Sequence, residues 1–130
     1  HVLGHQGEEA KTRLLSEAWA TVNTSVHEGL AVSFLESFAC ETPVISCQDP
    51  GYLVSRFGRY TGRFEGTGME GLDAFEVAMR YMLEQPEKWL EKGREARLWL
   101  QEEYRPQEFG ERLRALCGMA GRRLPEAGKD

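Results

Sequence analysis

Residues 27–43 have the sequence HEGLAVSFLESFACETP, and the apolar run Val44–Cys47 follows directly. Two glutamates, Glu28 and Glu36, stand eight positions apart in this stretch. Eight positions of α-helix span about 12 Å and return to within roughly 80° of the same face. The pattern predicts a short unit in which two carboxylates lie on either side of a helix N-terminus and a buried strand follows the helix.

Apolar periodicity predicts the elements around this unit. We expect helices at Glu8–Trp19, Ala31–Cys40, Leu72–Gln85, Pro86–Tyr104 and Pro106–Cys117. We expect strands at Val2–Gly4, Ala20–Thr24 and Pro43–Cys47, and a further short strand at Gly62–Glu65 within a region that is otherwise loop. The alternation of strands and helices favours an α/β domain, a Rossmann-like unit truncated at its N-terminus with three or four parallel strands.

Composition bounds the class of protein. The chain has 130 residues, of which 41% are hydrophobic and 28% charged, and its net charge of −5 favours no nucleic-acid partner. No signal-peptide or membrane-spanning pattern is evident, which favours a cytoplasmic protein. Because Cys40, Cys47 and Cys117 lack metal-ligand spacing, we expect reduced thiols and no metal site. The chain opens on His1 next to an expected strand, which indicates a cut inside a domain.

The segment Ser25–Leu30 links a predicted strand to a predicted helix, which is where ligands bind in open α/β sheets. Gly29 allows close approach to the backbone, and the free amides of residues 29–31 favour a phosphate or an electronegative sugar edge. Glu36 can accept paired hydrogen bonds from a ribose diol, and Glu28 from the hydroxyls of a second sugar. Each residue also has an ordinary interpretation, as a solvated glutamate, a residue favoured by the helix dipole, or a turn glycine.

The stretch resembles the donor-binding domain of glycosyltransferase family 4, the retaining enzymes of the GT-B fold. That family carries a short strand, Ser, two variable residues, Glu-Gly, an apolar helix with a second Glu eight positions on, and then Ala-Cys-Gly-Thr-Pro-Val-Ile. The matching residues in this chain are Ser25, Glu28, Gly29, Glu36, Ala39, Cys40, Thr42, Pro43, Val44 and Ile45. The resemblance covers roughly residues 2–117.

The resemblance implies roles for individual residues. Glu28 would be the catalytic residue that contacts the transferred sugar. The donor-binding residues would be Ser25, Gly29, Leu30, Ala31 and Glu36, with Glu36 on the ribose hydroxyls. Such enzymes use no metal ion or other cofactor, so stabilisation of the departing diphosphate is the main task of the protein.

The resemblance also implies what the whole protein does. It would be a hexosyltransferase that transfers a sugar, with retention, from a UDP- or GDP-linked donor to a glycan, lipid or small-molecule acceptor. Residues 1–117 would form part of the nucleotide-sugar-binding domain, and residues 118–130 a flexible tail. An N-terminal domain outside this chain would bind the acceptor, so the chain alone is expected to be inactive. The expected setting is polysaccharide biosynthesis in the cytoplasm, with peripheral association at the inner face of the membrane.

Some positions depart from the family pattern. Glu41 stands where glycine normally forms a left-handed helix cap, Thr24 where proline is common, and Ala31 where a second glycine is common. The upstream Arg and Lys that grip the diphosphate in the family are absent. We interpret the loop arginines, Arg56, Arg59 and Arg63, as surface residues and assign them no phosphate. Trp99 lies off the predicted inward face of its helix.

Two alternatives remain open. The chain fits a non-catalytic nucleotide- or carbohydrate-binding module that has the same fold but no transfer chemistry. It also fits, less well, another GT-B-like enzyme such as a sugar-nucleotide epimerase, against which the Glu28/Glu36 register argues.

Overall fold

The computed structural model describes residues 1–27, 29–64 and 71–119, without the side chains of Pro106 and residues 117–119. The chain divides into two compact units, His1–Leu100 and Gln101–Asp130. The first unit holds the sheet and the helices packed on it, and the second holds helix α6 (Pro106–Met119). Across the described residues, no helix is both long and apolar enough to cross a membrane.

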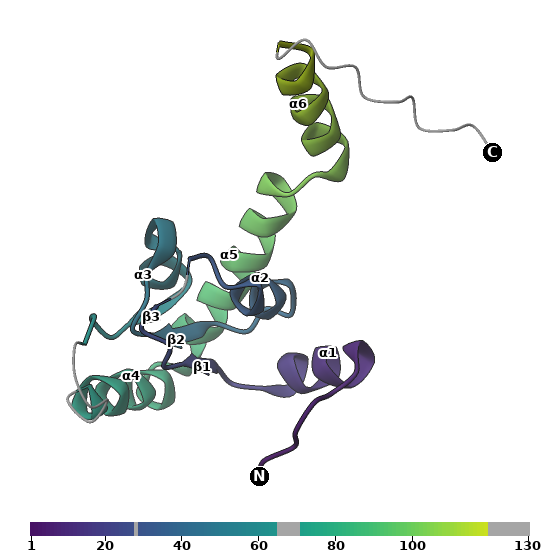
Figure 1. Ribbon diagram of the computed structural model, residues 1–130. Helices are drawn as coiled ribbons and strands as arrows, with labels where there is room; N and C mark the ends of the chain where they lie inside the picture. The colour runs from purple at the N-terminus through teal and green to yellow at the C-terminus, as the bar shows by residue number, and fades with distance from the viewer. Residues whose placement is uncertain (28, 65–70, 120–130) are drawn as a thin grey trace. The chain divides into compact units, whose positions relative to one another are not determined.

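Three short parallel strands form the sheet, β1 (Thr21–Asn23), β2 (Val44–Ser46) and β3 (Gly58–Tyr60), in the order β1-β2-β3 (Figure 1). Thr21 pairs with Val44 and Val44 with Gly58, so all three strands end at the same edge of the sheet. The predicted α/β architecture with an open parallel sheet is confirmed.

The helices of the first unit connect and cover these strands. Their bounds are α1 Glu8–Glu17, α2 Val32–Ala39, α3 Leu53–Phe57, α4 Leu72–Glu84 and α5 Pro86–Glu103, with a 3₁₀ turn at Pro50–Tyr52 before α3. Each longer helix lies where periodicity predicted it, within a residue or two at either end. The turn and α3 were predicted as loop, because one or two helical turns are too short for a periodic pattern.

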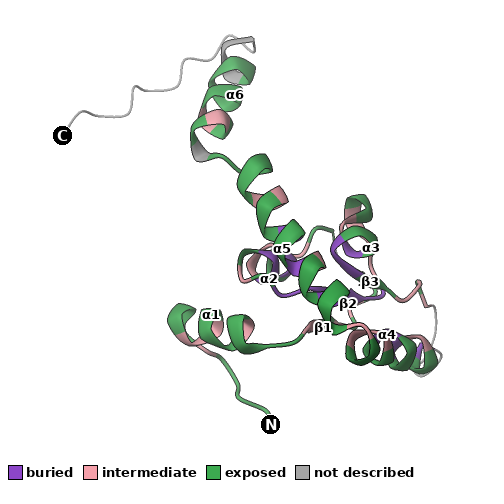
Figure 2. Ribbon diagram, turned by 180° about the vertical axis from the view of Figure 1, so that it is seen from behind, coloured by how far each residue is buried: buried purple, intermediate pink, exposed green. Residues whose placement is uncertain are grey.

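The core lies on both faces of β2. Successive residues of a strand point to opposite faces of a sheet. Val44 packs on one side with buried residues of α2, α3 and α5, namely Phe34, Phe38, Val54, Phe57 and Ala96. Ile45 packs on the other side with Cys47, Phe75, Ala78 and Trp89. Figure 2 shows β2 buried along its length, which confirms the buried strand predicted from the short, largely apolar run Val44–Cys47.

Two strand predictions are wrong. Residues 2–4 form no strand, and Val2 is fully exposed. The third strand lies at Gly58–Tyr60, whereas residues 62–64 are irregular and residue 65 lies outside the described residues. A side chain at position 58 would put its Cβ 1.9 Å from the carbonyl oxygen of Val44. Gly58 therefore permits β3 to approach β2, although glycine is a poor strand former by propensity.

Some side chains also face differently from prediction. On α2, Phe34 is buried, whereas Ala39, which matches the family pattern, is exposed. Trp99 was expected off the inward face, yet its ring packs against Phe57 at 5.4 Å and Phe38 at 6.4 Å between centroids. Aromatic contacts of this kind hold α5 to α2 and α3, so Trp99 belongs to the core of the first unit.

The end of α2 has the left-handed cap that the family pattern predicts. Glu41 has φ 60°, its N–H donates to the Phe38 carbonyl at 3.1 Å, and the Thr42 N–H donates to the Ser37 carbonyl at 2.9 Å. These two bonds form a Schellman motif. Gly93 of α5 lies against the cap, because a Cβ there would come within 1.9 Å of the Glu41 carbonyl oxygen. The cap is thus also a contact between α2 and α5.

Candidate functional site

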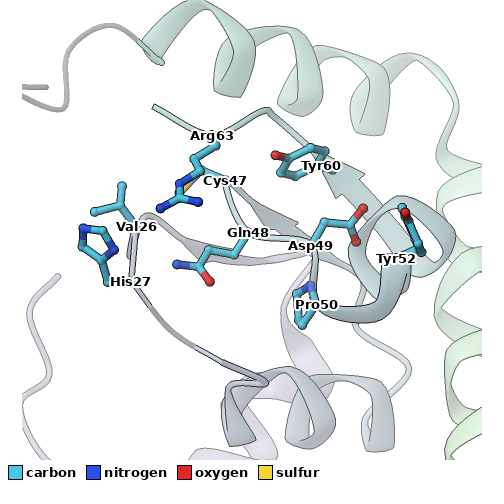
Figure 3. A pocket seen from close by; sticks show the side chains of 9 residues that line it. All are labelled: Val26, His27, Cys47, Gln48, Asp49, Pro50, Tyr52, Tyr60 and Arg63. Atoms are coloured by element: carbon cyan, nitrogen blue, oxygen red, sulfur yellow. The ribbon is translucent and has the colours of Figure 1, made fainter. Parts of the chain in front are cut away.

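The loops that leave the carboxyl ends of the three strands enclose a pocket of about 460 Å³, which we call the strand-end pocket (Figure 3). Its volume lies within the range of about 300–1,000 Å³ that is typical of small-molecule sites. Its lining residues come from the segments after β1, β2 and β3, and are Val26, His27, Cys47, Gln48, Asp49, Pro50, Tyr52, Tyr60 and Arg63. The carboxyl edge of an open parallel sheet is where such folds bind ligands.

Two of the lining residues hold the pocket together. Asp49 accepts hydrogen bonds at Oδ1 from the backbone N–H of Val54 (2.8 Å) and of Ser55 (3.0 Å), and its Oδ2 contacts the Ser55 hydroxyl. Its carboxylate thus caps the first turn of α3 and is already engaged. The Cys47 thiol donates to the Ser25 carbonyl at 3.2 Å, and burial raises the pKa of Cys47, so the neutral thiol ties β2 to the loop after β1.

The three arginines that were predicted to lie in a loop have different surroundings, since Arg56 lies on α3, Arg59 on β3 and only Arg63 in a loop. The guanidinium of Arg56 lies 4.5 Å from the centroid of the Phe57 ring, and that of Arg59 lies 5.0 Å from the Tyr81 ring. Both are cation–π contacts at the surface, as expected for structural arginines. Arg63 instead lines the strand-end pocket, and among the described residues it forms no ion pair. No pattern in the sequence predicts this difference, because all three arginines lie in one basic segment.

The predicted phosphate-facing segment lies between β1 and α2. The Ser25 N–H donates to Asn23 Oδ1 at 2.8 Å, which fixes the start of the segment. Gly29 and Leu30 are exposed, and a Cβ added at Gly29 would meet nothing within 4 Å. Ala31 is the N-cap of α2 and provides no side-chain acceptor for the amides of the first turn. Gly29 and Leu30 are therefore accessible from solvent, and neither they nor Ala31 line the strand-end pocket, so their role as donor-binding residues stays a prediction.

Of the two glutamates in residues 27–43, the structure describes Glu36 but not Glu28. Glu28 lies outside the described residues, so its role stays a prediction. Glu36 lies on α2, and its Oε1 accepts a hydrogen bond from Lys11 Nζ of α1 at 2.7 Å. Lys11 also contacts Glu8 at 3.1 Å. The hydrogen bond to Glu36 raises the pKa of Lys11 most, and the hydrogen bond to Glu8 raises it further. Lys11 therefore stays protonated at neutral pH.

The carboxyl edge of the sheet thus carries two adjoining features. One is the segment before α2, with Glu36 further along that helix. The other is the strand-end pocket, which is lined by residues of the same segment, Val26 and His27, and by residues of β3 and of the loops after β2 and β3. Within the described ranges, no group of three His, Cys, Asp or Glu side chains is arranged to hold a metal ion.

Sequence comparison assigns the family. The family model described as "Glycosyl transferases group 1" matches residues 1–99, that is, 99 of the 130 residues, and this range corresponds to the first compact unit. The chain belongs to this family of glycosyltransferases, with a Rossmann-like α/β unit. No curated protein and no solved structure matches it.

Proposed function

We propose that this chain is the donor-binding part of a retaining GT-B hexosyltransferase of glycosyltransferase family 4. The observation that carries the proposal is the segment before α2. It leaves β1 at the carboxyl edge of a parallel sheet and leads into a helix whose N-cap, Ala31, offers no side-chain acceptor. First-turn amides with no acceptor of their own attract phosphate oxygens. The match to the group 1 glycosyltransferases supports the same assignment.

The donor would be a UDP- or GDP-linked sugar. In this proposal Glu28 contacts the transferred sugar, and the amides of Gly29, Leu30 and Ala31 face the diphosphate. Ser25, at the start of the same segment, also belongs to the donor-binding residues. Charge on the departing diphosphate is then stabilised by backbone dipoles rather than by a metal ion or cofactor. The acceptor would be bound with the help of a further domain, and the setting would be polysaccharide biosynthesis in the cytoplasm at the inner face of the membrane.

Glu36 would hold the ribose diol. Its Oε1 is engaged by Lys11, whereas its Oε2 forms no hydrogen bond with the described residues. Because one ammonium contact fixes the carboxylate group, the second oxygen is presented in a restricted orientation. A carboxylate oxygen can accept hydrogen bonds from both hydroxyls of a vicinal diol.

A second function is favoured by that same contact. If Glu36 serves only as the structural partner of Lys11 between α1 and α2, the chain would be a carbohydrate- or nucleotide-binding module without transfer chemistry. The two candidates differ in what Glu36 binds and in whether a bound donor reacts.

Calorimetric titration with UDP, GDP and ADP tests the proposal. We expect one nucleotide to bind to the chain, and its affinity to be lower in Glu36→Ala. Glu76→Ala is the matched control, because Glu76 is an exposed helical glutamate that also forms a 2.7 Å ion pair, with Arg80. Absence of binding at millimolar concentration of all three nucleotides would contradict the proposal.

A reaction assay separates the enzyme from the module. Enzymes of this kind hydrolyse their donor slowly when no acceptor is present, so the protein that contains this chain should release sugar from the nucleotide sugar that binds. Glu28→Gln should abolish release without weakening nucleotide binding. Binding without any release would favour the module.

A further inference from the structure

We propose that Asn23 and Cys47 are positioning residues for the nucleotide. They hold Ser25 by both of its backbone groups, and so fix the segment of residues 25–31, which we call the donor segment, before the nucleotide binds. The inference rests on the proposed function, because it concerns the same donor site. Neither residue is assigned contact with the reacting atoms, since each acts through the backbone of Ser25.

The pairing of β1 with β2 ends just before the donor segment. Asn23, the last residue of β1, pairs with Ser46, the last residue of β2. Beyond this pair the two chains leave the sheet, so the regular ladder no longer sets their relative position. Contacts that follow the last pair therefore decide where the donor segment starts.

Ser25 is held from two directions. Its N–H donates to Asn23 Oδ1 at 2.8 Å, and its carbonyl oxygen accepts a hydrogen bond from the Cys47 thiol at 3.2 Å. The N–H and the C=O of one residue belong to the two peptide planes that flank it. Because both planes are bonded, the backbone of Ser25 has a defined orientation. Cys47 also lines the strand-end pocket with Val26 and His27, the two residues that follow Ser25 (Figure 3).

The two contacts differ in strength. A thiol is a weak donor, whereas the amide oxygen of Asn23 is an ordinary acceptor for an N–H group. Cys47 is nevertheless buried, in the same core cluster as Ile45 and Trp89, so water competes little for its sulfur. Burial also raises the pKa of Cys47, and the thiol keeps the proton that it donates. We therefore expect Asn23 to contribute more than Cys47.

The loop that carries Cys47 is itself held on both sides. The Gln48 N–H donates to Oγ of the buried Ser46 at 3.0 Å. The Asp49 carboxylate accepts hydrogen bonds from two backbone N–H groups in the first turn of α3. Cys47 lies between these anchored residues, so its sulfur is a fixed point. The contact with Ser25 thus connects the donor segment to β2 and to α3.

The rest of the donor segment has little packing of its own. Val26, His27 and Leu30 are exposed, and Gly29 is exposed and carries no side chain. Burial of side chains therefore contributes little to the order of the amides assigned to the diphosphate. That order depends on how the segment is held at its two ends, which are Ser25 and the first turn of α2.

Anchoring of this kind affects affinity. Ordering the backbone of one residue when a ligand binds corresponds to a loss of affinity of about five- to thirtyfold. If Ser25 is ordered in advance, the nucleotide does not have to supply that free energy. Release of Ser25 should thus weaken nucleotide binding without removing any group that is assigned contact with the nucleotide.

Calorimetric titration of the chain with UDP, GDP and ADP tests this inference. For the nucleotide that binds, we expect Asn23→Ala to weaken binding about tenfold and Cys47→Ala about threefold. Asn23→Ser keeps an acceptor oxygen and Cys47→Ser keeps a donor, so each should recover part of the lost affinity. Cys40→Ala is the matched control, because the Cys40 sulfur contacts the Thr12 carbonyl, at 3.8 Å, and should leave the affinity unchanged.

Backbone order is a readout that a merely structural role would not change. In ¹⁵N relaxation of the free chain, the order parameters of the Gly29 and Leu30 amides should fall in Asn23→Ala and Cys47→Ala, toward the values below about 0.6 of flexible backbone. Phe75→Leu truncates another residue of the core cluster that contains Cys47. It should lower the melting temperature at least as much as Cys47→Ala, with unchanged order parameters and unchanged affinity.

The double variant tests whether both contacts act on one residue. Because either single change already releases part of Ser25, Asn23→Ala combined with Cys47→Ala should weaken binding by less than the product of the two single losses. Losses that multiply would show two independent effects and contradict a shared hold on Ser25.

The inference and the proposed function fail separately. Nucleotide binding that depends on Glu36 but is unchanged in Asn23→Ala and Cys47→Ala would overturn the inference and leave the proposed function standing. A loss of affinity in Phe75→Leu as large as in Cys47→Ala, or order parameters that stay constant in all variants, would also overturn it. No binding of any nucleotide to the wild type, together with order parameters that fall in the two variants, would contradict the proposed function and support the hold on Ser25.

Discussion

Lys11 Nζ lies 2.7 Å from Glu36 Oε1, and these two residues are separated by 25 positions in sequence. The contact joins α1 to α2 and engages one oxygen of the carboxylate that we assign to the ribose. Glu8, one turn before Lys11, shares the same ammonium at 3.1 Å. Lys11 is thus held by two carboxylates and contacts one of the two oxygens of Glu36, which restricts the orientation of that side chain.

Replacing Lys11 by Met tests whether the ammonium positions Glu36. Without it the glutamate side chain regains rotamer freedom, which must be lost again when ribose binds. We expect nucleotide binding about two- to tenfold weaker, the range that corresponds to ordering one flexible side chain. Lys88→Met, an exposed lysine of α5, is the matched control. Tighter binding in Lys11→Met, measured by calorimetry, would show instead that Lys11 competes with the ligand.

Glycine at position 41 should stabilise the protein. Glu41 has φ 60°, and a residue with a Cβ in that conformation costs about 1 kcal/mol relative to glycine. Glu41→Gly also removes the contact between Glu41 and Arg97, 3.1 Å and half exposed. Glu41→Gln is the control, since it removes the charge and keeps the Cβ. Glu41→Gly should melt about 4–8 °C above Glu41→Gln for a domain of this size. Equal melting temperatures of Glu41→Gly and Glu41→Gln would contradict the cost assigned to a Cβ at the left-handed position 41.

A methyl group at Gly93 should be strongly destabilising. The added Cβ would lie 1.9 Å from the Glu41 carbonyl oxygen, a backbone atom that cannot move without opening the α2 cap. We expect Gly93→Ala to destabilise by at least about 2 kcal/mol, in the range of overpacked cores. Gly110→Ala adds the same methyl to α6, where its nearest neighbour would be 3.7 Å away. Helical propensity makes that change neutral or stabilising. Similar denaturant midpoints for the two variants would refute the close contact.

Lys92 gives a pH dependence of known sign. Burial lowers the pKa of Lys92. The charge of Glu95 raises this pKa by a smaller amount, and the charge of Arg59 lowers it further. The ammonium of Lys92 donates a hydrogen bond to the Arg56 carbonyl at 2.8 Å. Because the folded pKa is below the unfolded value, the unfolded state binds more protons between the two. Stability from this group therefore rises with pH in that window.

The corresponding measurement compares the wild type with Lys92→Met between pH 7 and about 10.5, the ordinary pKa of lysine. The melting temperature of the wild type should increase relative to that of Lys92→Met as the pH rises. Lys88→Met provides the reference for an exposed lysine. A difference that stays constant over the whole range would contradict the lowered pKa.

Local patterns in the sequence predict much of this fold. The short, largely apolar run Val44–Cys47 predicts a strand buried on both faces, and the structure places Val44 and Ile45 in opposite cores. The glycine expected after α2 correctly predicts a left-handed residue at position 41, although glutamate occupies it. The helices are predicted correctly because one buried face of a helix is enough to produce a helical spacing of apolar residues in the sequence.

The remaining features depend on contacts between distant residues. β3 forms because Gly58 can approach Val44, although glycine is depleted in strands and only Tyr60 of the three residues favours one. The site likewise depends on contacts between residues that are far apart in the sequence. Lys11 as the partner of Glu36, and Arg63 as a lining residue of the strand-end pocket, follow from how α1 and the loop after β3 return to the sheet edge.

The most direct test of the central claim, that Glu36 binds the ribose of a nucleotide donor, is a double cycle of binding affinities. It uses the nucleoside diphosphate that binds and its 2′-deoxy analogue, each titrated against the wild type and Glu36→Ala. If Glu36 accepts hydrogen bonds from the ribose diol, loss of the 2′-hydroxyl should weaken binding to the wild type about tenfold and leave the residual binding to the variant unchanged. An equal loss in both proteins, or no loss in the wild type, would contradict the assignment of Glu36.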